Sequence, residues 1–288
     1  MRRITAHIVA GLAAAAGLWG QPAGAQSLNI EGQTGGAVTP FATVSPAEGN
    51  RVHPVAGFSF LNMGETAGDR FQITLGGDVG GRVEFGYTKA GVVSGTADDI
   101  SHLFDRGFQN IHGKAVVLRP AAAGHLPSIA VGGRVRWNRE ELYQTTPMKN
   151  GDVYVVATES WPLGSGTSLL LNGGLKWTNA SLFAFTGTAT GWTTRAFAAA
   201  AADLRSVVLV GAEWVQQPKA FEGLPEAELP STLSVFAHVS PIKGRLTMTV
   251  ALVRFAGEIA SAPATLPSLA TVDVKATHTL VVGAGVRF

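Results

Sequence analysis

The chain contains no cysteine, and charged residues make up only 15% of its 288 positions. The absence of cysteine excludes disulfides, thiol catalysis and cysteine-ligated metal sites. Charge is also balanced, because 22 Lys and Arg face 20 Asp and Glu, and removal of Arg2 and Arg3 with a signal peptide would make the counts equal. A neutral chain gives no electrostatic support for nucleic-acid binding, so we expect no nucleic-acid partner.

Long apolar runs are also missing after the first 25 residues, where none approaches the ~18 residues of a transmembrane helix. Yet 46% of the chain is hydrophobic, and it contains 36 glycines. A chain that is apolar overall but lacks a spanning helix can pair all its backbone groups in a membrane by closing a sheet into a barrel. The composition therefore favours an all-β membrane protein.

The N-terminus has the pattern of a secretory signal peptide. Met1-Arg2-Arg3 is positively charged, an Ala-rich apolar stretch follows, and the small residues Ala23 and Ala25 form an A-x-A cleavage pattern. We expect residues 1–25 to be a signal peptide cut after Ala25. A retained membrane anchor is the less favoured alternative because the apolar stretch is short for a spanning helix.

The C-terminal segment has the pattern of a membrane strand. Counting back in steps of two from the last residue gives an apolar set, and the intervening residues are small or polar except Val281. This pattern is typical of the closing strand of an outer-membrane β-barrel, whose terminal Phe marks it for insertion; the final strand of a soluble sandwich is the alternative. The predicted insertion signal comprises Leu280, Val282, Ala284, Val286 and Phe288.

Similar alternation recurs along the chain. In 128–137, for example, Ile129, Val131 and Val135 oppose Arg134 and Arg136. With weaker candidates, including 182–188, about thirteen strand-length segments are present, and single-chain bacterial barrels use an even number. We therefore predict a transmembrane antiparallel up-and-down β-barrel of about 12 strands, with 10 to 14 allowed, over residues 51–288. A soluble sandwich would have polar outer faces.

Four polar stretches are predicted extracellular loops, namely 94–107, 140–151, 216–230 and 257–274. The Ala-rich residues 196–202 fit either a short helix or plug piece, or a strand of small residues against which something packs closely. Residues 26–50 are Gly-rich with few strand signals, and we expect them to lie in the periplasm or to plug the lumen.

If the apolar residues face lipid, the alternating polar residues point into the lumen, because a charge at mid-membrane on the lipid face costs ~2–4 kcal/mol. Cations exceed carboxylates in this set, which favours anions in a pore. The alternative is a closed barrel filled by a salt-bridged network, since about 12 strands leave a slim interior. The pore-lining candidates are Arg82, Glu84, Arg134, Arg136, Asn172, Lys176, Glu213 and Arg245.

The run from Ile30 to Ala42, IEGQTGGAVTPFA, resembles the opening of a proteobacterial family of outer-membrane proteins, domain of unknown function 3034. Further similarity lies in 126–132, 169–180 and 210–218. The resemblance implies an outer-membrane barrel and implies no activity, catalytic residue or cofactor.

We therefore predict a porin-like passive channel for small, possibly anionic, solutes in the outer membrane of a Gram-negative bacterium. A non-conducting structural or adhesion barrel and a carrier for hydrophobic compounds are the first alternatives, and a lumen or lipid-facing enzyme is the least favoured one. No histidine lies in a hydrolase or metalloprotease motif, so we expect no enzyme activity, catalytic residue, metal or cofactor. The expected partners are outer-membrane lipid and lipopolysaccharide, the barrel-assembly machinery, periplasmic chaperones and small solutes.

Overall fold

The computed structural model describes residues 27–44, 51–63, 68–96, 108–119, 126–142, 146–180, 188–217, 231–242, 244–256 and 278–288. Twelve of its strands close into one barrel, which confirms the predicted fold class and strand number. Two short strands, β1 (Ser27–Leu28) and β2 (Thr34–Gly35), form a separate pair. The barrel strands are β3 (Val52–Asn62), β4 (Gly68–Val79), β5 (Val83–Thr96), β6 (Gln109–Leu118), β7 (Ser128–Leu142), β8 (Thr146–Gly164), β9 (Thr167–Ala180), β10 (Thr188–Leu204), β11 (Val208–Gln216), β12 (Ser231–Ile242), β13 (Leu246–Ala256) and β14 (Thr279–Arg287).

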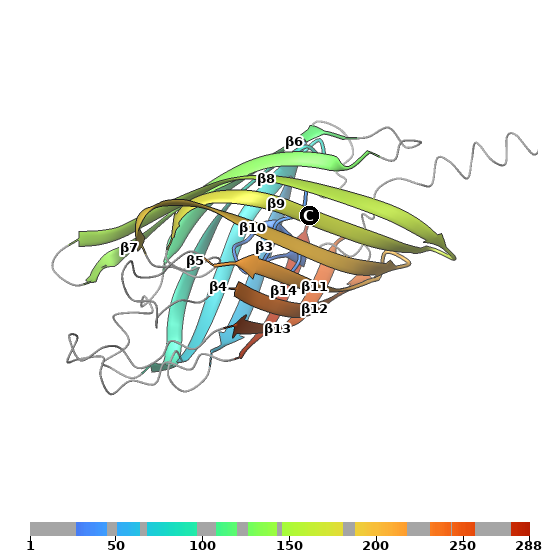
Figure 1. The fold of residues 1–288 in the computed structure, drawn as a ribbon. Helices are drawn as coiled ribbons and strands as arrows, with labels where there is room; N and C mark the ends of the chain where they lie inside the picture. The colour runs from blue at the N-terminus through green and yellow to red at the C-terminus, as the bar shows by residue number, and fades with distance from the viewer. Residues whose placement is uncertain are drawn as a thin grey trace, which may run out of the picture.

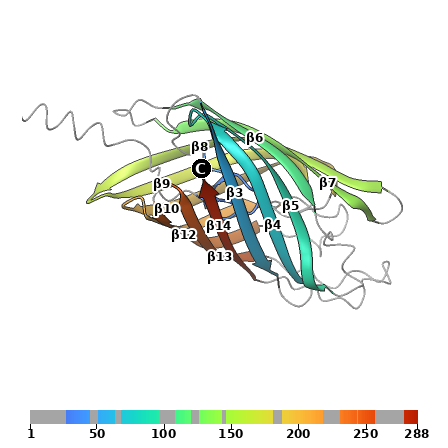
Figure 2. The ribbon, with the colours of Figure 1, turned by 180° about the vertical axis from the view of Figure 1, so that it is seen from behind.

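Each barrel strand pairs antiparallel with the next strand along the chain, and the last pairs with the first. The closing seam between β14 and β3 runs from the Leu280–Asn62 pair to the Arg287–Val55 pair. Figure 2 shows β14 in dark red beside β3 in blue. This simple up-and-down order leaves no free sheet edge, which is the condition for a sheet to span lipid.

The outer face of the barrel is apolar, as the alternation predicts. On β12, for example, Leu233 and Val235 are exposed, whereas Ser234 and His238 between and beyond them are buried. Soluble proteins rarely expose contiguous apolar surface on this scale, so the belt is the lipid-facing surface. Every barrel strand contributes to it, through residues such as Phe58, Ile73, Phe85, Ile111, Val135, Val155, Leu175, Trp192, Trp214, Val235, Val250 and Val282.

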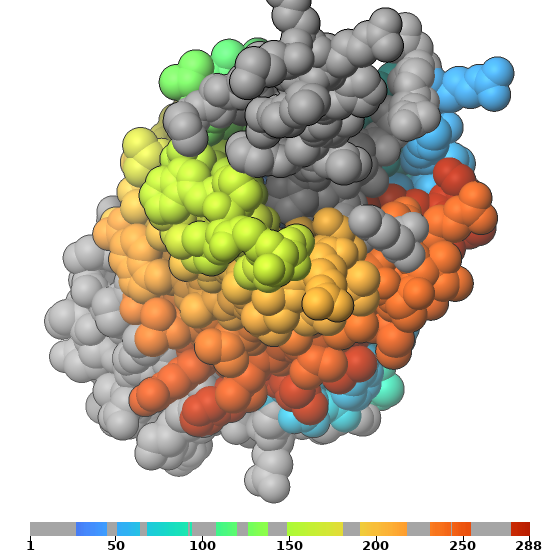
Figure 3. All heavy atoms as spheres, turned by 90° about the vertical axis from the view of Figure 1, so that its right-hand side faces the viewer, coloured from blue at the N-terminus to red at the C-terminus, as the bar shows by residue number. Residues whose placement is uncertain are grey.

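Most of the connections at one end of the barrel are shorter than most of those at the other, and the connection 119–127 between β6 and β7 is an exception. At one end lie short turns such as 80–82, 165–166 and 205–207, and the terminal Phe288 lies at this end, where its N–H donates to Pro54 O. Gly80 and Gly81 both have φ of 57°, as a tight hairpin turn requires. Figure 3 shows the tip of the β8–β9 hairpin, coloured yellow-green, nearest the viewer. The longest connections join β5 to β6, β11 to β12 and β13 to β14 at the other end.

Some expectations need correction. The predicted loop 140–151 is mostly strand, because β7 runs to Leu142 and β8 starts at Thr146. Residues 196–202 lie within β10, so the helix interpretation is wrong. The signal peptide with Ala23 and Ala25, and the strand candidate 182–188 except Thr188, lie outside the described residues. No helix among the described residues is long and apolar enough to span a membrane.

Candidate functional site

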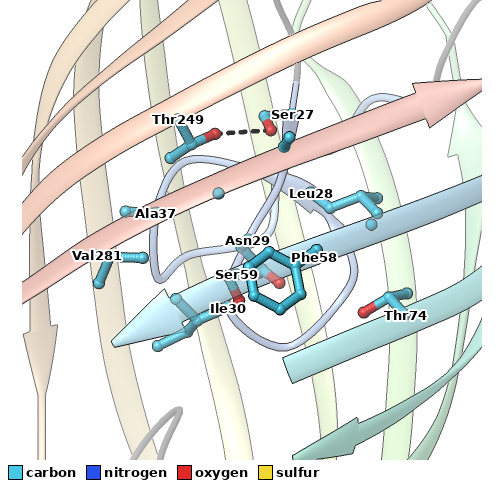
Figure 4. Close-up of a pocket in the computed structure, with 13 residues that line it drawn as sticks. Ser27, Leu28, Asn29, Ile30, Ala37, Phe58, Ser59, Thr74, Thr249 and Val281 are labelled. Carbon is cyan, nitrogen blue, oxygen red and sulfur yellow. Dashed lines mark hydrogen bonds between the residues drawn. The ribbon is translucent and has the colours of Figure 1, made fainter. Parts of the chain in front are cut away.

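The N-terminal segment, residues 27–44, lies inside the barrel. Its trace coils within the ring of strands, where Figure 1 draws it in blue and Figure 4 shows it behind β14 and β3. Every residue of the segment is buried except Leu28, which is half-buried. Asn29 shapes its turn, because Asn29 Oδ1 accepts the N–H of Glu31 at 2.9 Å and of Gln33 at 3.0 Å. We call this segment the plug.

The plug contacts the wall all round its circumference. Thr34 alone meets three strands: its N–H donates to Glu84 Oε1 on β5 at 3.0 Å, its carbonyl accepts from Lys114 Nζ on β6 at 2.9 Å, and its hydroxyl is 3.1 Å from Arg287 Nη2 on β14. Other hydrogen bonds and ion pairs connect the plug to β7, β8, β9, β11 and β13. A segment bonded to so many strands crosses the slim interior from wall to wall.

Glu31 of the plug enters a cluster of wall cations. Its Oε1 pairs with Arg136 Nη2 and its Oε2 with Arg134 Nη1, while Lys176 Nζ lies 3.9 Å from Oε2. Asp152 is the wall carboxylate of the cluster, 2.5 Å from Arg134 Nε and 2.9 Å from Arg136 Nη2. The wall therefore offers three cations against one carboxylate, and Glu31 neutralises half of the excess. The side chains of all five residues are at most 1% exposed.

A second contact places a wall carboxylate against plug backbone. Glu213 on β11 accepts the N–H groups of Ala37, Val38 and Thr39 at 3.1, 3.0 and 2.8 Å. It also accepts the hydroxyls of Thr39 at 2.6 Å and Ser234 at 2.5 Å. Consecutive backbone N–H groups form a concave anion site, and here the anion belongs to the barrel.

A glycine makes this approach possible. A Cβ on Gly36 would lie 2.2 Å from Glu213 Oε1, so any larger residue would displace the carboxylate. Gly36 thus serves close packing of the plug against β11, whereas a Cβ on Gly35 would lie 2.1 Å from Thr39 O within the plug itself.

Apolar side chains also hold the plug against the wall. Ile30, Val38 and Phe41 belong to a buried cluster with wall residues that point inward, among them Leu61 and Phe197. This contact resembles a protein core, and it stabilises the plug through burial of apolar surface. Ala199 and Ala201 of the Ala-rich stretch belong to the same cluster, which accounts for the small residues in β10.

A small cavity remains between the plug and the seam of the barrel. It has a volume of about 20 Å³, room for about one water molecule, and is lined by plug residues Ser27 and Ile30 and wall residues Phe58 and Val281. Figure 4 shows these side chains and the hydrogen bond of 2.8 Å between Thr249 Oγ1 and Ser27 Oγ.

The pore-lining candidates divide into two groups. Arg82 and Arg245 are exposed residues of the short turns, so their predicted inward orientation is wrong: the strand alternation does not extend into the turn. The others are buried on the inner face and take part in the plug contacts just described, directly or through a neighbour. These are Glu84, Arg134, Arg136, Asn172, Lys176 and Glu213.

Sequence reasoning missed several residues of the site. Asp152 and Lys114 alternate with outward-facing Val153 and Ile111, so the strand period of β8 and β6 carries a signal for both. Glu31 has no such signal, because the plug has no membrane-strand period. Among the described residues, no group of three or more His, Asp or Glu is placed to hold a metal ion.

Fold and interior together define a class of protein: a transmembrane β-barrel of twelve strands that holds its own N-terminal segment inside. The chain belongs to the family described as Protein of unknown function (DUF3034), whose model matches residues 23–265. A search of curated proteins finds no match.

Three solved structures illustrate the similarity of fold. The KdgM porin in complex with disordered oligogalacturonate has a TM-score of 0.49 and 8% identity, covering 81% of this chain and 99% of that one. The NanC porin has a TM-score of 0.48 and 6% identity, and the match covers 83% of this chain and 100% of that one. LpxR from Salmonella typhimurium has a TM-score of 0.46 and 10% identity, and the match covers 81% of this chain and 99% of that one. At such low identity the likeness concerns the fold alone.

Proposed function

We propose that this protein is an outer-membrane channel for small solutes, closed by the plug. The apolar belt and the closed sheet support a place in a membrane that accepts β-barrels. The end with the short turns corresponds to the periplasmic end of such barrels. The plug continues into β3 at this end, so it would withdraw towards the periplasm.

The observation that carries the proposal is the chemistry of the inner wall behind the plug. Buried charges are costly, and an apolar filling is often as stable as a buried ion pair. A wall that carries Arg134, Arg136, Lys176 and Glu213 can be hydrated when the plug leaves, whereas a purely apolar wall would resist wetting. The polar wall therefore suits an interior that alternates between filled and water-filled states.

A second candidate is a non-conducting barrel in which the plug is a permanent core. The buried cluster around Ile30, Val38 and Phe41 favours it, because withdrawal of the plug would expose this apolar surface. The two candidates differ in whether the plug moves, and that difference can be measured.

The experiment uses the absence of native cysteines. The double variant Ser27→Cys with Thr249→Cys places two thiols where the two hydroxyl oxygens are 2.8 Å apart. A disulfide between these cysteines would tether the plug to β13. In planar bilayers, we expect the oxidised double variant to be silent and the reduced form to recover the openings of the wild type. Thr249→Cys alone is the control, and its current should be the same under oxidising and reducing conditions.

Measurable currents that are identical in the oxidised and reduced forms would refute the plug as the gate. The non-conducting barrel would instead be supported if no current appears in the reduced form, in the wild type or in a variant with a weakened plug contact such as Glu31→Gln. This conclusion requires that heat-modifiable mobility on gels shows each barrel to be folded.

A further inference from the structure

We infer that Arg134, Arg136 and Lys176 form a binding site for the carboxylate of an organic solute, and that Glu31 is the ligand built into the chain. For its role in transport this inference rests on the proposed channel; the binding itself does not. The site lies on the inner faces of β7 and β9 and is completed by Asp152 on β8.

The geometry identifies a carboxylate as the ligand. Each oxygen of Glu31 meets a different guanidinium, and the ammonium of Lys176 stands 3.9 Å from one of them. A planar group with two oxygens matches such a pair of donors. The cations are held in place from behind, because Asn150 Oδ1 accepts from Arg136 Nη1 at 2.7 Å and Asp152 contacts all three.

The wall has more binding capacity than the plug uses. Arg134 Nη2 and Arg136 Nε are buried and have no hydrogen-bond partner among the described residues. Without Glu31 the cluster would carry three positive charges and one negative one, in an interior where charge is poorly screened. Such a site binds an anion from solution, and a solute carboxylate would compete with Glu31 for the same donors. Competition of this kind would couple arrival of the solute to release of the plug.

Glu31→Ala tests the site directly, since the atoms removed correspond to acetate. We expect acetate to raise the unfolding temperature of this variant by about 3 °C once its concentration exceeds the dissociation constant tenfold. Acetamide, which has the same shape without charge, should have no effect. In the double variant Glu31→Ala with Arg136→Gln, acetate should no longer raise the unfolding temperature. In the wild type, Glu31 already occupies the site, so acetate should raise the unfolding temperature little.

An equal shift with acetamide, or an equal shift in the double variant, would overturn the inference. An equal shift with sulfate at matched ionic strength would overturn the assignment to carboxylates.

A second measurement uses the wild type and so does not depend on the variant folding. Hydrogen exchange of residues 27–44 should accelerate with acetate but not with chloride at equal ionic strength, because acetate competes with Glu31. No difference between the two salts would contradict the competition.

The two proposals can fail separately. If tethering the plug leaves conductance unchanged while acetate still stabilises Glu31→Ala, the channel proposal fails and the site stands. If tethering abolishes openings but no acetate response appears, the gate stands and the carboxylate site fails.

Discussion

Glu31→Gln should release the plug. The substitution keeps the size of the side chain but removes its charge, and the new amide N–H groups can face the guanidinium donors of Arg134 and Arg136. Removal of one partner of a buried ion pair costs about 3–5 kcal/mol. Since Asp152 still compensates part of the cluster, the low end applies, about 3 kcal/mol.

This energy acts on the balance between the seated and the released plug. At about 1.4 kcal/mol per tenfold, the ratio of released to seated states should rise about a hundredfold. Single-channel recording measures this ratio as open probability, and hydrogen exchange of residues 27–44 reports it without requiring conductance. The two readouts should change together.

Glu159→Gln provides a matched control, because it makes the same chemical change on a half-buried residue near the β8–β9 turn, outside the plug contacts. It should leave both readouts at wild-type values. If Glu31→Gln folds and shows the same open probability and the same exchange as this control, the cation cluster does not hold the plug, and the reasoning is refuted.

Four further predictions concern the plug seat and the barrel surface. Glu213→Gln should weaken the charge-assisted bonds to Ala37–Thr39, by about 1.5–3 kcal/mol, and speed their amide exchange; unchanged protection would contradict this. Gly36→Ala should cost about 1–3 kcal/mol, because its Cβ would lie 2.2 Å from Glu213 Oε1; a neutral effect on urea unfolding would show that the carboxylate can shift freely. Val250→Arg, on the exposed apolar face of β13, should destabilise the barrel in lipid vesicles by about 2–4 kcal/mol, and equal stability would argue against lipid at that position. Phe288→Ala should lower the amount of barrel assembled in the outer membrane, and wild-type levels would count against an insertion signal at the C-terminus.

The alternation along the strands determined the barrel and much of its inner wall. A β-strand places successive side chains on opposite faces, and lipid penalises charge on one of them, so apolar Val131 and Val135 imply inward Arg134 and Arg136. The same reasoning reached Lys176 and Glu213. It failed at Arg82 and Arg245, because a turn has no such period and its charged side chains face solvent.

Only the tertiary structure decided what fills the barrel. The plug has no membrane-strand period, and its two short strands are two residues each. Its contacts join positions far apart in the chain, such as Glu31 and Arg136, 105 residues away. Strand alternation reports which face a residue occupies, but it cannot report which distant side chain meets it there. The sequence therefore determined a polar lumen, and the fold decided that the chain's own carboxylate and backbone occupy it.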